Sequence, residues 1–340
     1  MKPAWSALAL LAFALASSEA LAQQPPGIGI TWGSGTGTQT WGPPPPQVGP
    51  SYGSSSGQSS DLEIGTLYVA SAAYGVGAGV WIDAEFGVKE NAIRFIPPAI
   101  LGVGAPIGVY FLDHPPMPRG VPAAISSGMF IGAGEGMGIW SYQYVKSSAS
   151  DQWGFTGMAR SVFIGSTLGG IGGAAMGYLQ APSPKQSLFM SSAVLWGAGI
   201  GSMFGYGSTS KDKPYAEAND SASLGGLIGY NVGLLGAAGL STVWVPTYRN
   251  IAFMWAGAGA GAAAGFIAFP FSPNRRYLVF QGTATTLGLA AGAVFTLDDP
   301  DDFAKTDPYG RPKQALASIT GVGPMAVQGG MGAQVTGVLF

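Results

Sequence analysis

The sequence predicts an all-α membrane protein, built from about eight apolar helices that are arranged as hairpins and packed through glycine zippers. Three observations support this fold class. Charged residues make up only 9% of the 340 residues, whereas ordinary soluble domains carry roughly 25%. Glycine occurs 56 times, often at every fourth position of an apolar stretch. Several runs without Asp, Glu, Lys or Arg exceed the roughly 20 residues with which a helix crosses a bilayer.

Residues 1–22 have the pattern of a secretory signal peptide. Lys2 supplies a positive charge, residues 7–16 form an apolar core, and Ala20-Leu21-Ala22 provides small residues at a cleavage position. An uncleaved membrane anchor is the alternative. The sequence contains no cysteine, so we expect neither disulfides nor lipid attachment through a thiol. We therefore expect export to the cell envelope, with attachment to its membrane through the apolar segments.

Residues 23–60 are rich in Pro, Gly, Ser and Gln. A segment of this composition buries too little apolar surface to offset the entropy lost on ordering. We therefore expect a disordered linker, followed by a glycine-rich membrane domain over residues 61–297.

Within that domain, apolar segments alternate with short polar loops that carry nearly all of the charge. The first two helices are expected to end at Asp83 and Asp113, each of which follows an aromatic-rich segment. A polar turn near residues 149–150 would fold the next two helices into a hairpin. The expected helices cover residues 62–82, 93–112, 121–145, 155–179, 187–208, 222–245, 250–270 and 277–297.

The later segments share a plan in which Pro, Ser or Thr precedes a basic residue, then apolar residues, then glycines. Ser183-Pro184 and Ser272-Pro273 fit a helix N-cap followed by proline in the first turn. This weak repetition predicts stacked helical hairpins.

An outer-membrane β-barrel is the alternative fold. Glycines at every second position, as in Gly257, Gly259 and Gly261, suit strands, and the terminal Phe340 resembles the end of bacterial outer-membrane barrels. However, the charge-free runs are much longer than a membrane strand of about 9–11 residues. They contain no central Asn-Gly or Asp-Gly turn, and they lack the alternating polar face of barrel strands. These features favour helices.

Glycines spaced by four residues lie on one face of a helix. In water each would cost about 1 kcal/mol relative to alanine, but in an apolar medium they let neighbouring helices approach closely. The predicted packing glycines are Gly165, Gly169, Gly173, Gly177, Gly225, Gly229, Gly233, Gly257, Gly261 and Gly265.

Glu135 is the most informative polar residue, because it lies in the middle of an apolar segment. An ionisable group at membrane depth is costly and is usually paired or functional. In a hairpin centred on residues 149–150, position 135 faces position 164, and Arg160 lies one turn away. We therefore predict a Glu135–Arg160 pair, either as a structural ion pair or as the polar lining of a pore or substrate path. Asn231 and Gln281, also mid-segment, are expected to form interhelical hydrogen bonds.

The remaining polar residues predict no catalytic, cofactor-binding or metal site. His114 is the one histidine, so it cannot build a multi-histidine metal site, and no placed nucleophile accompanies it. The acidic loop over residues 298–314 lacks the spacing of an EF-hand, and an apolar C-terminal tail follows over residues 315–340. A net charge of −2 without a basic patch argues against nucleic-acid binding.

These patterns favour a non-catalytic integral membrane protein of the cell envelope, with a structural, scaffolding or pore-forming role. Its expected partners are the lipid bilayer and, in an oligomeric form, further copies of itself. The alternatives are an outer-membrane β-barrel porin or transporter, and an ion-coupled transporter or intramembrane enzyme that uses Glu135. Lys and Arg do not alternate between successive loops, so the positive-inside rule gives no orientation. This favours the outer membrane over the inner one.

Overall fold

The computed structural model describes residues 57–90, 93–210, 212–267, 269–271, 274–296, 317–327 and 330–339. The chain divides into residues 1–52 and residues 53–340, and the described residues all belong to the second unit. The expected signal peptide, most of the expected linker, the acidic loop and Phe340 lie outside the described residues.

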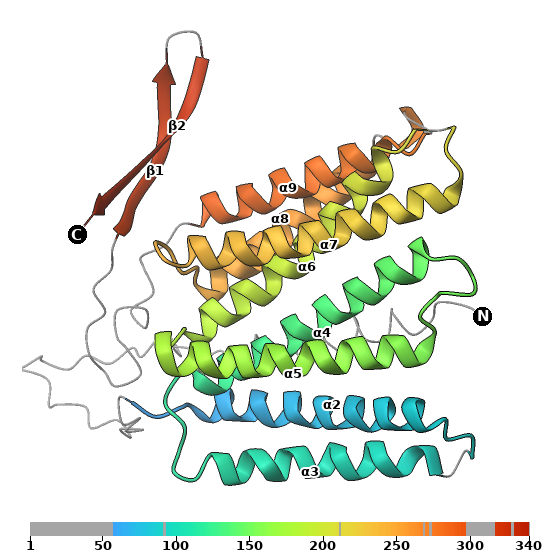
Figure 1. The fold of residues 1–340 in the computed structure, drawn as a ribbon. Coiled ribbons are helices and arrows are strands. Elements are labelled where there is room, and N and C mark those ends of the chain that lie inside the picture. Colours follow the sequence, from blue (N-terminus) through green and yellow to red (C-terminus); the bar gives the residue numbers. More distant parts are fainter. Residues whose placement is uncertain are drawn as a thin grey trace, which may run out of the picture. The chain divides into compact units, whose positions relative to one another are not determined.

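Long α-helices make up most of the described residues (Figure 1). They are α2 (Asp61–Phe86), α3 (Ile96–Leu112), α4 (Val121–Lys146), α5 (Phe155–Gln180), α6 (Pro184–Gly207), α7 (Tyr215–Leu240), α8 (Tyr248–Phe266) and α9 (Tyr277–Phe295). Short 3₁₀ turns, η1 (Ile93–Phe95) and η2 (Phe269–Phe271), precede α3 and follow α8.

The C-terminal segment, which the sequence predicts only as an apolar tail, contains an antiparallel β-hairpin. Strand β1 (Ala317–Val327) pairs with β2 (Gly330–Leu339), with a register irregularity between Ile319 and Gly321. This hairpin is the one strand-forming region among the described residues.

The helices agree with the predicted all-α membrane class. Six of the described helices are long and apolar enough to cross a bilayer, by length and composition. The β-barrel alternative is not supported, because the segments concerned are continuous helices. Gly257, Gly259 and Gly261, for example, all lie inside α8. A helix satisfies its backbone hydrogen bonds within one segment, which is what a chain in an apolar medium requires.

Consecutive helices pack against each other as pairs: α2 with α3, α4 with α5, α6 with α7, and α8 with α9 (Figure 1). Each pair also contacts the next pair along the chain. Helix α2 contacts α4 and α5, α4 contacts α6 and α7, and α6 contacts α9.

Polar caps define where several of these helices begin. The Ser183 hydroxyl accepts a hydrogen bond from the backbone N–H of Gln186, and Pro184 occupies the first turn of α6. This is the cap predicted from the sequence. Thr247 caps α8 in the same way, by accepting from the N–H of Asn250. Such caps satisfy N–H groups that have no partner within the helix.

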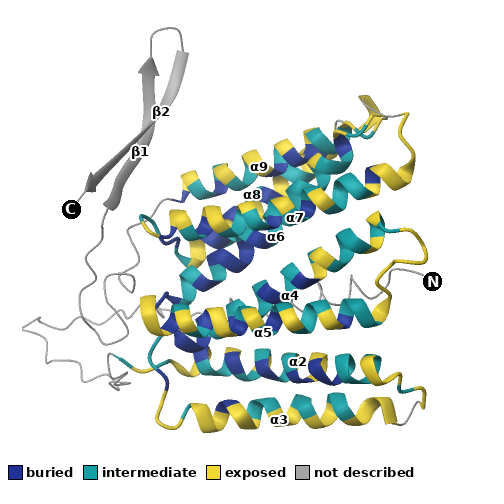
Figure 2. Ribbon diagram, in the orientation of Figure 1, coloured by how far each residue is buried: buried dark blue, intermediate teal, exposed yellow. Residues whose placement is uncertain are grey.

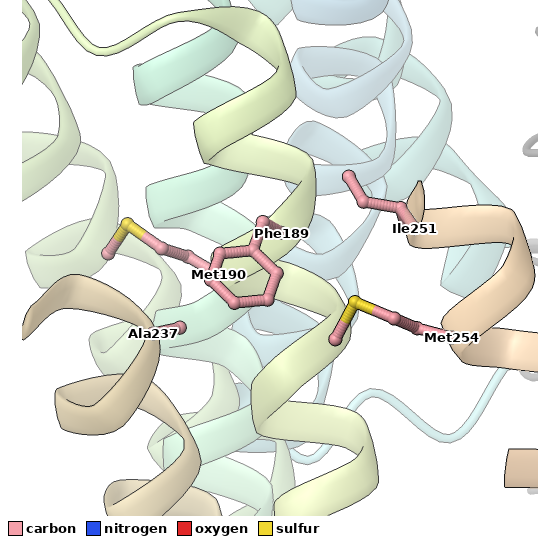
Figure 3. Packing of buried hydrophobic residues seen from close by; sticks show 5 residues of the cluster. All are labelled: Phe189, Met190, Ala237, Ile251 and Met254. Atoms are coloured by element: carbon pink, nitrogen blue, oxygen red, sulfur yellow. The ribbon is translucent and has the colours of Figure 1, made fainter. Parts of the chain in front are cut away.

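A small apolar core joins the α6–α7 pair to α8. It consists of Phe189 and Met190 from α6, Ala237 from α7, and Ile251 and Met254 from α8 (Figure 3). The two methionines suit this place because their flexible side chains fill irregular gaps between helices.

Large apolar side chains also cover the outward faces of the helices. Leu179 of α5 is 83% exposed and Phe295 of α9 is 86% exposed, and Figure 2 shows exposed residues on helices of every pair. So much exposed apolar surface is unfavourable in water but not among lipid tails. The described helices therefore suit a lipid bilayer.

Candidate functional site

A pocket of about 750 Å³ lies among α4, α5, α6 and α7. Most of its lining consists of glycines and apolar side chains from α4 and α5, and α7 contributes Tyr230, Asn231 and Leu234. Among its lining residues, Glu135 is the one carboxylate and Arg160 is the one cation. The pocket is therefore an apolar space with a few polar groups, which is the usual character of a small-molecule site.

Close packing of α4 on α5 shapes one wall of this pocket. A Cβ added at Gly132 would overlap the carbonyl oxygen of Gly165, and one added at Gly136 would overlap that of Ser161. The two backbones are thus in direct contact at these positions. Gly132, Gly136, Ser161 and Gly165 all line the pocket, so no large side chain projects from this part of its wall.

Glu135 reaches across from α4 to α7. Both of its carboxylate oxygens accept from the side-chain N–H₂ of Asn231, at 3.1 Å each. The same amide nitrogen also donates to the carbonyl oxygen of Leu227, at 3.0 Å, one turn earlier in α7. Asn231 is therefore anchored on its own helix and directed at the carboxylate. Its prediction as an interhelical hydrogen-bonding residue agrees with this contact.

Tyr230 sets the position of α7 on α4. Its hydroxyl donates to the carbonyl oxygen of Ile131 at 2.6 Å, and only 6% of the residue is exposed. Gly134 lies directly beneath the ring, where an added Cβ would collide with the hydroxyl. The absence of a side chain at Gly134 thus admits the tyrosine. With Tyr230 seated, the next residue, Asn231, faces Glu135.

The predicted Glu135–Arg160 pair does not form in the structure. Arg160 instead binds Glu85 of α2 with two hydrogen bonds, from Nε to Oε1 at 2.6 Å and from Nη2 to Oε2 at 2.8 Å. The Trp81 indole N–H donates to the same carboxylate at 2.9 Å. Hydrogen bonds from Arg160 and then from Trp81 lower the pKa of the Glu85 carboxyl below its usual value.

The physical reason for this difference is the face of α5 on which Arg160 lies. Phe163, three residues further along α5, stacks on Trp81 of α2 with ring centroids 4.2 Å apart. Thr167, one turn beyond, hydrogen-bonds to Tyr74 of α2 at 2.9 Å. This face of α5 therefore packs against α2, whereas the glycine face of α5 packs against α4.

The predicted packing glycines all lie where an added Cβ would come closer to another helix than side chains normally do. Those of α5 contact α4, those of α7 contact α6, and those of α8 contact α9. They are Gly165, Gly169, Gly173, Gly177, Gly225, Gly229, Gly233, Gly257, Gly261 and Gly265. Gln281 of α9 donates to the carbonyl oxygen of Ala262 in α8, at 3.5 Å.

Sequence reasoning missed three residues of this region. Glu85 falls outside the helix predicted over residues 62–82, although it lies in the last turn of α2. The sequence assigns Gly134 only to the pattern of glycines at every second position, and Tyr230 gives no signal, because an aromatic residue is ordinary in an apolar helix. The adjacent mid-segment Asn231 was the available signal for Tyr230.

Comparison of the chain with protein-family models, with curated proteins and with solved structures gives no match. The chemistry of the pocket therefore follows from its own residues. A carboxylate surrounded by apolar walls can accept hydrogen bonds and can pair with a cation.

Proposed function

We propose that the protein is a non-catalytic integral membrane scaffold of the cell envelope, built from helical hairpins that pack through glycine zippers. The observation that carries this proposal is the backbone contact between paired helices, which recurs in successive pairs of the chain. The glycines in these contacts lie where two helix backbones meet, so we assign them a structural role.

The same kind of glycine contact is found in three successive helix pairs. Gly132 of α4 meets Gly165 of α5, and Gly201 of α6 meets Gly225 of α7. In the last pair the carbonyl oxygen of Gly288 in α9 lies where a Cβ on Gly257 in α8 would be. Contacts of this kind stabilise helices in lipid, where van der Waals packing replaces the hydrophobic effect as the force between them.

The first pair follows the same plan with different partners. An added Cβ at Gly75 of α2 would overlap the carbonyl oxygen of Leu101 in α3, and one at Gly79 would collide with the backbone of Pro98. A repeated pair that stacks on its neighbours is the logic of a modular array. About eight helices in hairpins, together with an exported N-terminus and the outer membrane as the favoured location, complete the proposal.

Membrane fractionation of cells that express the full chain tests the proposal at its base. We expect the protein to stay in the pellet after alkaline carbonate extraction, and density gradients to separate outer-membrane from inner-membrane residence. Release into the carbonate supernatant would overturn integral membrane insertion.

Planar bilayers test the scaffold role against pore formation. Purified protein inserted into a bilayer is expected to add no discrete conductance steps above those of protein-free detergent. Reproducible steps that scale with the amount of protein would replace the scaffold with a pore.

A further inference from the structure

We propose that the pocket among α4, α5, α6 and α7 binds a hydrophobic amine, with the ammonium group on Glu135 and the apolar chain along the pocket walls. This goes beyond the scaffold role. It rests on one part of the proposed function, that the helices are embedded in lipid. It does not depend on whether the protein acts as a scaffold.

The first argument concerns the hydrogen bonds of the Glu135 carboxylate. Glu135 receives both of its described hydrogen bonds from a single nitrogen, that of Asn231. A carboxylate offers about four acceptor positions, so Glu135 keeps acceptor capacity at the pocket that it lines. An ionised carboxylate among apolar walls is costly until a cation or further donors join it.

The cation already present at the pocket is held elsewhere. Arg160 lines the pocket, but its guanidinium makes two short hydrogen bonds to Glu85 of α2. Bidentate pairing of this kind is the preferred geometry of arginine with a carboxylate. Arg160 is therefore paired with Glu85, and the pocket lining offers Glu135 no other cation.

The pocket lining indicates the size and the apolar character of the ligand. Apolar side chains surround the space, and its volume of about 750 Å³ falls within the 300–1,000 Å³ typical of small-molecule sites. The residues concerned are Ile131, Ile139, Ile164, Leu168, Met176 and Leu234. One carboxylate among such walls fits a ligand with one positive charge and one apolar chain. A fatty acid has the wrong sign, and an alcohol lacks the charge.

The test uses the full-length protein in lipid nanodiscs of phosphatidylcholine, with a spin-labelled long-chain alkylamine as the probe. We expect saturable binding of the probe, and displacement of it by dodecylamine but not by dodecanol or dodecanoate. Glu135→Gln is expected to weaken probe binding about tenfold or more, which corresponds to roughly 1.4 kcal/mol or more. Glu217→Gln, which removes an exposed carboxylate from the first turn of α7, is expected to bind the probe like wild type.

A second variant protects the test against misfolding of Glu135→Gln. Gly172 lines the pocket, and an added Cβ there would meet nothing within 4 Å, so Gly172→Leu places a bulky side chain on the pocket wall at a position where the helix backbones do not touch. Gly236→Leu is its control, because Gly236 is also uncrowded and lies on α7 away from the pocket lining. Of these two glycine variants, we expect only Gly172→Leu to lose binding of the alkylamine probe.

Three outcomes would overturn the proposal: equal probe binding by wild type and a folded Glu135→Gln, equal displacement by dodecanol, and unchanged binding by Gly172→Leu. Failure of the scaffold proposal can be told apart from failure of this inference. Channel conductance would overturn the scaffold role alone, and release by carbonate would remove the lipid embedding that both proposals need. A membrane-embedded, non-conducting protein without alkylamine binding would overturn this inference alone.

Discussion

The hydroxyl of Tyr230 donates a 2.6 Å hydrogen bond to the backbone carbonyl oxygen of Ile131. This contact joins the second helix of one pair to the first helix of the preceding pair. It is possible because Gly134 leaves room for the ring. The next residue of α7, Asn231, donates to Glu135, so the contact lies beside the polar part of the pocket.

Filling the space beneath Tyr230 should therefore weaken the packing of α7 on α4. We expect Gly134→Ala to destabilise the protein by about 1–3 kcal/mol, the usual cost of overpacking. Denaturant unfolding in mixed micelles, followed by circular dichroism, measures the effect. Gly104→Ala in α3 is the control, because an added Cβ there meets nothing within 4 Å. Equal unfolding midpoints for the two variants would argue against close packing of Tyr230 on Gly134.

Removing only the tyrosine hydroxyl should have a smaller effect. We expect Tyr230→Phe to lower the free energy of unfolding by about 0.5–1.5 kcal/mol, as for a typical hydrogen bond. Tyr178→Phe is the matched control, because Tyr178 is 51% exposed. If both variants unfold at the wild-type midpoint, the hydrogen bond contributes nothing measurable.

Gly229 of α7, which lies close to the backbone of α6, can be compared with an uncrowded glycine of the same helix. A Cβ at Gly229 would overlap the carbonyl oxygen of Gly197, whereas one at Gly236 would meet nothing within 4 Å. We expect Gly229→Ala to cost about 1–3 kcal/mol, and Gly236→Ala to stay within about 1 kcal/mol of wild type or to gain stability through helix propensity. The same unfolding assay separates them. A stabilising Gly229→Ala would contradict close helix contact there.

The polar contact between Asn231 and Glu135 predicts non-additive mutations. Asn231→Leu alone leaves the carboxylate without this donor, so we expect a loss of about 1–3 kcal/mol. Changing Glu135 to Leu as well removes the stranded charge and should recover part of that loss. A double-mutant cycle measures the coupling. Strictly additive effects would mean that the two side chains do not interact.

The Arg160–Glu85 pair predicts a dependence on pH. Because the pKa of Glu85 is lowered in the folded protein, the contribution of the pair to stability is fully present at neutral pH. It is lost as the pH falls through that lowered pKa. We therefore expect the difference in unfolding midpoint between wild type and Glu85→Gln to shrink on acidification. A difference that stays constant down to about pH 3 would contradict this, since an ordinary glutamate has a pKa of about 4.3.

Sequence patterns were sufficient to locate most helices. The segment predicted over residues 155–179 is α5, Phe155–Gln180, because an apolar run of this length suits a membrane helix and is too long for a single membrane strand. The start of α7 was misplaced. Glu217 and Asp220 read as loop residues, although they lie in its first turns, where Glu217 pairs with Lys213 at 2.9 Å.

The choice of partner for each helix face was beyond the sequence. Spacing indicated that Arg160 and Glu135 lie at similar depth, but depth does not say which neighbour covers which side of α5. That choice depends on stacking of Phe163 on Trp81, a contact between residues far apart in the chain. The strand pairing of the C-terminal tail was missed for a similar reason, because a short apolar segment suits several structures.

The packing of each helix on its immediate successor has a consequence for how the protein is made. The glycine contacts within each pair join helices that are consecutive in the chain, so a pair needs no later part of the chain in order to close. Maturation can therefore follow the order of synthesis, with α2 and α3 docking before α8 and α9 exist. Truncation after α7 would then leave the first two pairs able to close, whereas the α6–α7 pair would lose the apolar core that it shares with α8.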